Sequence, residues 1–178
     1  MRFPLRPGEP TVRSMMSTPI TTAAIALDYG KTISLDHVDP AFGQKPVDPG
    51  AAETLRVLYG RKKRLILASN TLPSESRWPA LQAAGIDDVF TLALLSHSLG
   101  VGKPDPLFYH LVIAAADCPA QEILFVGDHL VNDVLEPMGH GMRAALVRQD
   151  GLRADEELPD GAVLIRHVRE LPELLAEQ

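Results

Sequence analysis

Four polar positions along the chain could together act on a phosphoryl group. Asp28 ends the apolar run AAIAL, Ser69 and Asn70 end RLILAS, Lys103 precedes a helix-like segment, and Asp128 ends EILFVG. Two carboxylates can hold a hard cation such as Mg²⁺, a lysine and a hydroxyl can bind phosphoryl oxygens, and one carboxylate can attack phosphorus. This set predicts phosphoryl chemistry, provided that the fold brings the four positions together.

Short apolar runs alternate with longer helix-like segments. The strand-like runs are AAIAL, RLILAS, DVFTLALLS, EILFVG, RAALVR and AVLIRH, and the segments between them have helical periodicity. Uninterrupted apolar runs suit strands covered on both faces, so we predict the α/β class, a three-layer α/β/α sandwich with a mainly parallel, Rossmann-like sheet. Ligands of such sheets collect at the carboxyl ends of the strands, where these polar residues lie. We expect the helices to face the core through Leu55, Leu58, Tyr59, Leu107, Leu111 and Ile113.

Length and composition narrow the possible functions. The 178 residues, 46% of them apolar, predict one α/β domain over residues 20–178, after a disordered leader at residues 1–19. The net charge of −6 argues against general nucleic-acid binding. We see no secretory pattern and no apolar run of the roughly 18–20 residues that span a bilayer, so we expect no membrane partner and a cytoplasmic location. The single cysteine, Cys118, fits a reducing compartment.

Four motifs carry a resemblance to the haloacid dehalogenase-like (HAD-like) superfamily, most of whose members are magnesium-dependent phosphatases with an aspartate nucleophile. In chain order they are DYGKT from Asp28, SNT from Ser69, GVGKPDP with Lys103, and FVGDHLVND with Asp128 and Asp133. Each motif alone is weak, but their order and strand context make a specific joint pattern over about residues 23–150. The resemblance implies hydrolysis of a phosphate monoester, on a small molecule or a macromolecule.

The same resemblance implies a role for each matching residue. Asp28 would be the nucleophile and would bind Mg²⁺ together with Asp128 and the backbone carbonyl of Gly30. Ser69 and Lys103 would be catalytic residues that bind the phosphoryl group, while Thr32 and Asn70 would help to form the substrate site. Asp133 would orient Lys103 or a metal-bound water, and His129 would support the site.

Gly30 departs from the family pattern. Family phosphatases usually carry Asp two residues after the nucleophile, where it protonates the leaving oxygen and later activates water. Glycine can do neither, and loss of one acid-base group typically costs about 10²- to 10⁴-fold in rate. Candidate substitutes are His129 and the Asp36-His37 pair, although an ordinary surface role is the simpler interpretation of each histidine. The alternative function is therefore a catalytically impaired protein that binds a phosphorylated ligand or a protein partner.

Two further expectations concern specificity. Neither the segment between Thr32 and Pro49 nor that between Ser69 and Lys103 has room for an inserted cap domain, so the site should be open or closed by a neighbouring subunit of a homo-oligomer. The first of these segments, with Asp36, His37, Asp39, Phe42 and Lys45, is the best place to look for substrate contacts. Dehalogenation is the weaker interpretation, because the family's dehalogenases need no metal and this chain keeps the metal-type acid Asp128.

Overall fold

The strands form one parallel sheet. The computed structural model describes residues 22–41 and 43–175, so the leader expected at residues 1–19 and the residue Phe42 lie outside the described residues. The strands are β1 (Ala24–Leu27), β2 (Arg64–Ser69), β3 (Phe90–Leu95), β4 (Ile123–Gly127), β5 (Arg143–Val147) and β6 (Val163–Ile165). They are arranged in the order β3-β2-β1-β4-β5-β6, and every neighbouring pair is parallel. The predicted α/β class is therefore confirmed.

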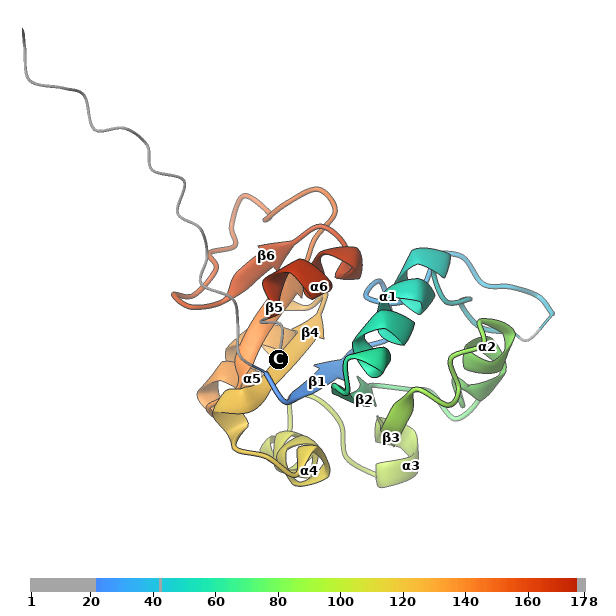
Figure 1. Ribbon diagram of the computed structural model, residues 1–178, viewed down its shortest axis with the longest axis horizontal. Helices are drawn as coiled ribbons and strands as arrows, with labels where there is room; N and C mark the ends of the chain where they lie inside the picture. Colours follow the sequence, from blue (N-terminus) through green and yellow to red (C-terminus); the bar gives the residue numbers. More distant parts are fainter. Residues whose placement is uncertain (1–21, 42, 176–178) are drawn as a thin grey trace, which may run out of the picture.

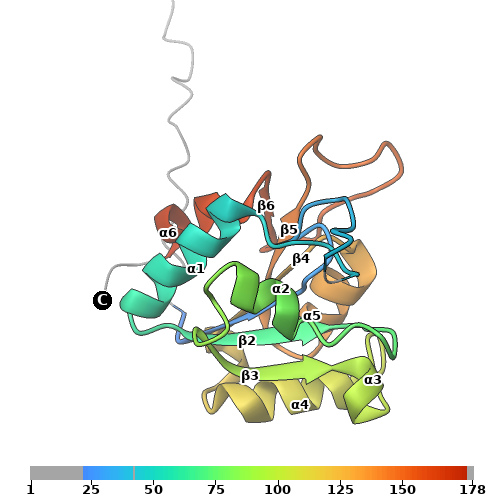
Figure 2. The same cartoon turned by 90° about the vertical axis from the view of Figure 1, so that its right-hand side faces the viewer.

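Helices cover both faces of this sheet. One face packs against α1 (Pro49–Gly60), α2 (Trp78–Ala83), and the turn η3 (Val168–Glu170) with α6 (Leu171–Leu174). The other packs against α4 (Pro106–Ala116), the π-helical segment η2 (Leu130–Leu135) and α5 (Glu136–Gly139). The short helices α3 (Ser96–Leu99) and η1 (Ala120–Glu122) complete the chain. Figure 1 shows the sheet between these layers, and Figure 2 shows α4 on the opposite side of β2 and β3 from α1 and α2.

The central strands are buried on both faces because alternate side chains enter two different clusters. Ile25 and Leu27 of β1 belong to the cluster under α1, whereas Ala24 and Ala26 belong to the cluster under α4. The prediction for the helix faces was right for Leu55 and Leu58, which are fully buried, and wrong for Tyr59 and Leu107, which are 47% and 54% exposed. Tyr59 follows Leu58 directly and is therefore turned about 100° away from the core-facing side of α1.

The connection that would carry a cap is a loop. Its described residues, between β1 and α1, form only two isolated antiparallel bridges, Ser34 with Val47 and Asp39 with Gln44. Between Ser69 and Lys103 the chain forms α2, the sheet strand β3 and the short helix α3. Within the described residues, no separate unit is inserted at either place. None of the described helices is both long and apolar enough to cross a bilayer.

Candidate active site

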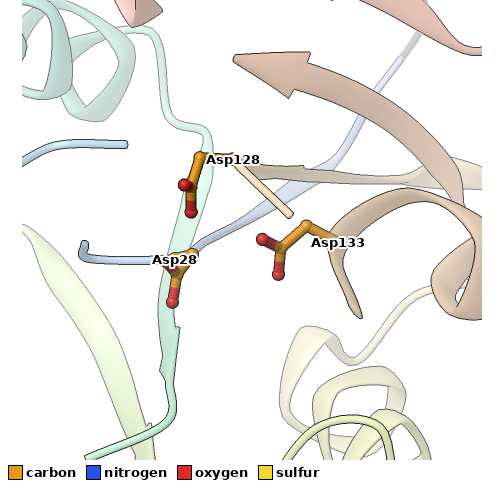
Figure 3. Close-up of side chains that lie close together, drawn as sticks. All are labelled: Asp28, Asp128 and Asp133. Carbon is orange, nitrogen blue, oxygen red and sulfur yellow. The ribbon is translucent and has the colours of Figure 1, made fainter. Parts of the chain in front are cut away.

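The acidic residues meet at the carboxyl edge of the sheet because β1 lies between β2 and β4. Asp28 directly follows β1 and Asp128 directly follows β4, and Leu27 is paired with Val126 across the two strands. The N–H of Asp28 donates to the carbonyl of Val126 at 2.9 Å, so the ladder continues into the site. Asp133 enters from η2, and one oxygen from each of the three carboxylates lies within 4.8 Å of the others. Figure 3 shows these three side chains close together.

Lys103 bridges two of these acids. Its Nζ donates to Oδ1 of Asp28 at 2.9 Å and to Oδ1 of Asp133 at 2.7 Å. The side chains of Lys103 and Asp133 are only 3% and 1% exposed, and that of Asp28 is 12% exposed. A buried ammonium held by two carboxylates is fixed in position.

Burial and neighbouring charges shift the pKa values of Lys103, Asp133 and Asp128. Burial disfavours the charged form of Lys103, but attraction to Asp28 and Asp133 outweighs it and raises the pKa of the lysine. Burial raises the pKa of Asp133 to about 6, against the opposing effect of Lys103. Burial also raises the pKa of Asp128, and the charge of Asp28 adds to this effect. Repulsion between Asp28 and Asp128 is thus only partly balanced by the cationic side chains around them.

Asn70 holds the backbone that carries Lys103. Its side-chain amide donates to the carbonyl of Lys103 at 2.8 Å and accepts the N–H of Lys103 at 2.9 Å. The loop can approach this closely because residue 102 is glycine: a Cβ there would lie 2.6 Å from Oδ1 of Asn70. The structure therefore places the Asn70 amide on protein backbone, although the residue borders the active-site cavity.

Gly127 makes the same kind of room for Asp133. A Cβ at this last position of β4 would lie 2.2 Å from Cγ of Asp133. The carboxylate also accepts the N–H of His129 at 2.9 Å, and Tyr109 of α4 donates to the carbonyl of Asn132 at 2.8 Å, which ties η2 to the sheet. The glycine before the second acid is thus required by packing against Asp133.

Ser69, Thr32 and His129, the other site residues expected from the sequence, lie outside the cluster of Lys103 and the three acids. Ser69 is 1% exposed and its hydroxyl donates to the carbonyl of Asn70 at 3.2 Å, at the wall of the cavity. The hydroxyl of Thr32 donates to the carbonyl of Gly30 at 3.3 Å and lies inside the turn after β1. His129 lines the cavity, and its Nδ1 accepts the N–H of Asn132 at 3.2 Å. An accepting Nδ1 leaves the ring proton on Nε2, which makes that atom a hydrogen-bond donor.

The loop pair proposed as an acid-base substitute lies away from the cluster. The side chain of Asp36 is 75% exposed and bound to Lys45 at 2.8 Å, and the residue lines a neighbouring cavity. His37 is exposed and lines neither that cavity nor the active-site cavity. Of the three substitutes considered from the sequence, His129 alone borders the cavity with Asp28.

Two cationic residues at the site, Lys31 and Arg77, had not been assigned from the sequence. They line the cavity, of about 290 Å³, together with Lys45 of the loop in which substrate contacts were expected. The guanidinium of Arg77 lies 4.4 Å from the centre of the Tyr29 ring and donates to Glu75 at 3.1 Å. Lys31 lies inside the first motif and could have been noticed there, whereas only the folded loop after β2 brings Arg77 to the site.

The residues at the sheet edge fit a hard divalent cation. Oδ1 of Asp28 already accepts a hydrogen bond from Lys103. The carboxylate of Asp133 accepts hydrogen bonds from Lys103 and from the N–H of His129. The nearest cation to the Asp128 carboxylate is Arg148, at 4.0 Å. Asp28 and Asp128 therefore offer carboxylate oxygens of the kind that Mg²⁺ prefers, and a cation between them would relieve the repulsion between the two acids.

Comparison with known proteins agrees with this combination of a parallel α/β fold and an acidic site at the strand ends. The family model described as haloacid dehalogenase-like hydrolase matches residues 18–136. The chain belongs to this family.

Relatives within the family differ in their named activities. Phosphoserine phosphatase from Thermus thermophilus is 31% identical over 126 residues, which are 71% of this chain and 50% of that protein. A HAD phosphatase structure from Thermococcus onnurineus superposes with a TM-score of 0.64 at 26% identity, over 74% of this chain and 59% of that one. The structure of a 2-haloacid dehalogenase from Pseudomonas syringae pv. Tomato superposes with a TM-score of 0.62 at 29% identity, over 74% of this chain and 54% of that one. The chain thus spans about half the length of the curated relatives that it matches.

Proposed function

We propose that this protein is a magnesium-dependent hydrolase of phosphate monoesters with Asp28 as its nucleophile. The observation that carries the proposal is the position of Lys103, 2.9 Å from Asp28 and 2.7 Å from Asp133, beside the second acid Asp128. The named activities of several relatives, which include phosphoserine and phosphoglycolate phosphatases, support it. Dehalogenation is not proposed, because the family's dehalogenases need no metal and that reaction would leave the second acid, Asp128, without a use.

The proposed reaction has two steps at one phosphorus atom. A carboxylate oxygen of Asp28 attacks phosphorus, the bond from phosphorus to the ester oxygen breaks, and the departing oxygen takes a proton from solvent water to leave as the alcohol. Water then attacks the phosphorus of the aspartyl phosphate, which releases inorganic phosphate and restores the carboxylate. The Ser69 hydroxyl and the Lys103 ammonium bind the phosphoryl oxygens, and Asp133 and Asn70 keep Lys103 in place. Mg²⁺, held by Asp28, Asp128 and the Gly30 carbonyl, would neutralise negative charge on the phosphoryl group.

We assign His129 to interact with the leaving oxygen, which in family phosphatases is served by the aspartate that Gly30 replaces here. Its Nε2–H can donate a hydrogen bond to the leaving oxygen. Because its Nδ1 accepts a backbone N–H, the ring has no proton to transfer and no free nitrogen to act as a base. The activation of water is therefore weaker than in a phosphatase with Asp at this position. We also include in this proposal a cytoplasmic location, and a substrate or a second subunit that covers the open edge.

A panel of phosphate monoesters tests the function. With Mg²⁺ the natural protein should release inorganic phosphate, and Asp28→Asn should lose at least about 10³-fold in kcat/KM. Asp155→Asn is the matched control, because Asp155 is exposed and lies outside both cavities near the site. Failure of every ester, or equal rates for Asp28→Asn and the natural protein, would reject the proposal and leave the impaired, ligand-binding alternative.

A further inference from the structure

A second cavity opens beside the active site. It has a volume of about 470 Å³ and is formed by the loop after β1, the loop after β5 and the residues after β6. It shares Lys31 and Asp128 with the active-site cavity, so the two spaces are adjacent. The lysine and arginine residues that line it are Lys31, Arg148, Arg153 and Arg166.

Most carboxylates that line this cavity already have partners. Asp48 accepts the N–H of Ala51 at 2.9 Å and lies 3.1 Å from His167, and Asp36 is bound to Lys45. Asp128 belongs to the proposed cation site. This leaves Asp150, whose carboxylate has no hydrogen bond or ion pair with any of the described residues, to oppose the cations of the cavity.

The cations are less completely paired. Lys31 and Arg166 have no ion pair within the described residues. Arg148 is bound to Glu156 at 3.0 Å, yet its buried Nε finds no hydrogen-bond partner among the described residues.

The backbone of Lys31 is also unusual. Its φ of 55° lies in the left-handed region, which residues other than glycine, asparagine and aspartate seldom adopt. The N–H of Lys31 donates to the hydroxyl of Ser34 at 3.2 Å, which helps to hold this conformation. A lysine held in an unfavourable conformation at the junction of two cavities indicates a use for its side chain there.

We infer that the second cavity is the subsite for the leaving group, and that it takes a phosphate monoester with a second anionic group, a carboxylate or another phosphate. This inference rests on the proposed function, because it assumes that phosphoryl transfer occurs at Asp28. Lys31 and the guanidinium of Arg166 would bind the second anion, since both are exposed cations that line the cavity without an ion-pair partner of their own.

Matched substrates test this subsite. Alkyl phosphates would be compared with ω-carboxyalkyl phosphates and α,ω-alkane bisphosphates of the same chain length, over chains of about two to six carbons. We expect kcat/KM to be at least about 10-fold higher for one anionic series at a preferred length, since hydrogen bonds to charged groups contribute about that factor or more. The two anionic series decide between carboxylate and phosphate.

Charge-removing variants localise the effect. Arg166→Gln and Lys31→Gln should each reduce the ratio of kcat/KM for the anionic over the alkyl substrate by about 5-fold or more. Arg61→Gln, an exposed position after the end of α1 and outside both cavities, should leave this ratio unchanged. Equal kcat/KM for anionic and alkyl substrates, or a preference that survives both Arg166→Gln and Lys31→Gln, would overturn the inference while leaving the proposed function intact.

Binding measurements separate the two proposals. If no ester is hydrolysed, the proposed function fails, and calorimetry with the same compounds and Mg²⁺ on the natural protein still tests the subsite. Tighter binding of the anionic series, lost in Arg166→Gln, would support it. Equal affinity for the anionic and alkyl phosphates would reject it.

Discussion

Restoring a carboxylate at position 30 should increase turnover. The substitution Gly30→Asp fits the structure, because a Cβ there meets no heavy atom closer than Oδ2 of Asp28 at 4.0 Å, and the backbone is outside the left-handed region. A positioned acid-base group contributes about 10²- to 10⁴-fold. Since His129 already supplies a donor at this side of the cavity, we expect a gain near 10²-fold in kcat.

The new carboxylate should also destabilise the folded protein, because it lies close to Asp28. Two unit charges 4 Å apart repel by about 1 kcal/mol in water and by about 4 kcal/mol at an effective dielectric of 20. This repulsion from Asp28 raises the pKa of the introduced carboxyl, which suits a general acid, and it lowers the free energy of unfolding by an amount between these limits. Bound Mg²⁺ should recover part of that loss.

The assay is steady-state phosphate release from an alkyl phosphate and from p-nitrophenyl phosphate. The gain should be larger for the alkyl ester, whose leaving oxygen needs a proton more. Gly30→Asn is the matched control, since it has nearly the same shape but no acid-base group, and it should give no gain. Equal gains in the Asp and Asn variants, or a lower rate in Gly30→Asp at full Mg²⁺ saturation, would refute the reasoning about Gly30.

Three further predictions concern the metal, the packing and the helix cap. The pKa of Asp128 is raised, and a cation requires the ionised carboxylate. As the pH is lowered, the Mg²⁺ affinity measured by calorimetry should therefore begin to fall at a higher pH than it would for an ordinary aspartate; an affinity that stays unchanged down to about pH 4 would contradict this. Gly127→Ala should reduce kcat/KM by about 10²-fold, because its Cβ displaces Asp133 and with it Lys103; an unchanged rate would show that Asp133 is not needed there. Asp48→Ala should lower the free energy of unfolding by about 1 kcal/mol in denaturant titrations, through loss of the α1 cap, whereas Asp48→Asn should retain most of it.

The contribution of Asp48 to the free energy of unfolding depends on pH. Burial acts to raise the pKa of Asp48, but the N–H of Ala51 and the charges of His167 and Arg169 lower it overall. A lowered pKa in the folded state means that the stabilisation is present above the ordinary aspartate value and is lost as the pH falls through the folded-state pKa. The difference in unfolding free energy between the natural protein and Asp48→Asn should therefore shrink in strong acid, and a difference that grows there would contradict the assignment.

The sequence was most informative where residues are adjacent to strand ends. The apolar runs predicted the strands, and parallel topology then brings Asp28, Ser69 and Asp128 to one edge, since β2, β1 and β4 are neighbours. Lys103 follows no strand directly; its place before a helix-like segment and the family resemblance pointed to it, but its exact position depends on a loop held by Asn70.

Other parts of the site depend on tertiary contacts that no local pattern encodes. Arg77 reaches the cavity because the loop after β2 folds back and stacks its guanidinium on Tyr29. The second cavity combines Lys31 with Arg166, which belong to segments on opposite ends of the sequence. The exposure of Tyr59 and Leu107 likewise depends on which side of each helix meets the sheet, and an apolar residue type alone did not determine it.

Detection of the phosphorylated enzyme tests the central claim most directly. The natural protein would be mixed with a hydrolysed ester and Mg²⁺, quenched in acid within a turnover, and digested for mass spectrometry. We predict a phosphoryl adduct, labile to hydroxylamine, on the peptide that contains Asp28, and none in Asp28→Asn. Steady phosphate release without such an adduct under single-turnover conditions, or an adduct on Asp128 instead, would contradict the account.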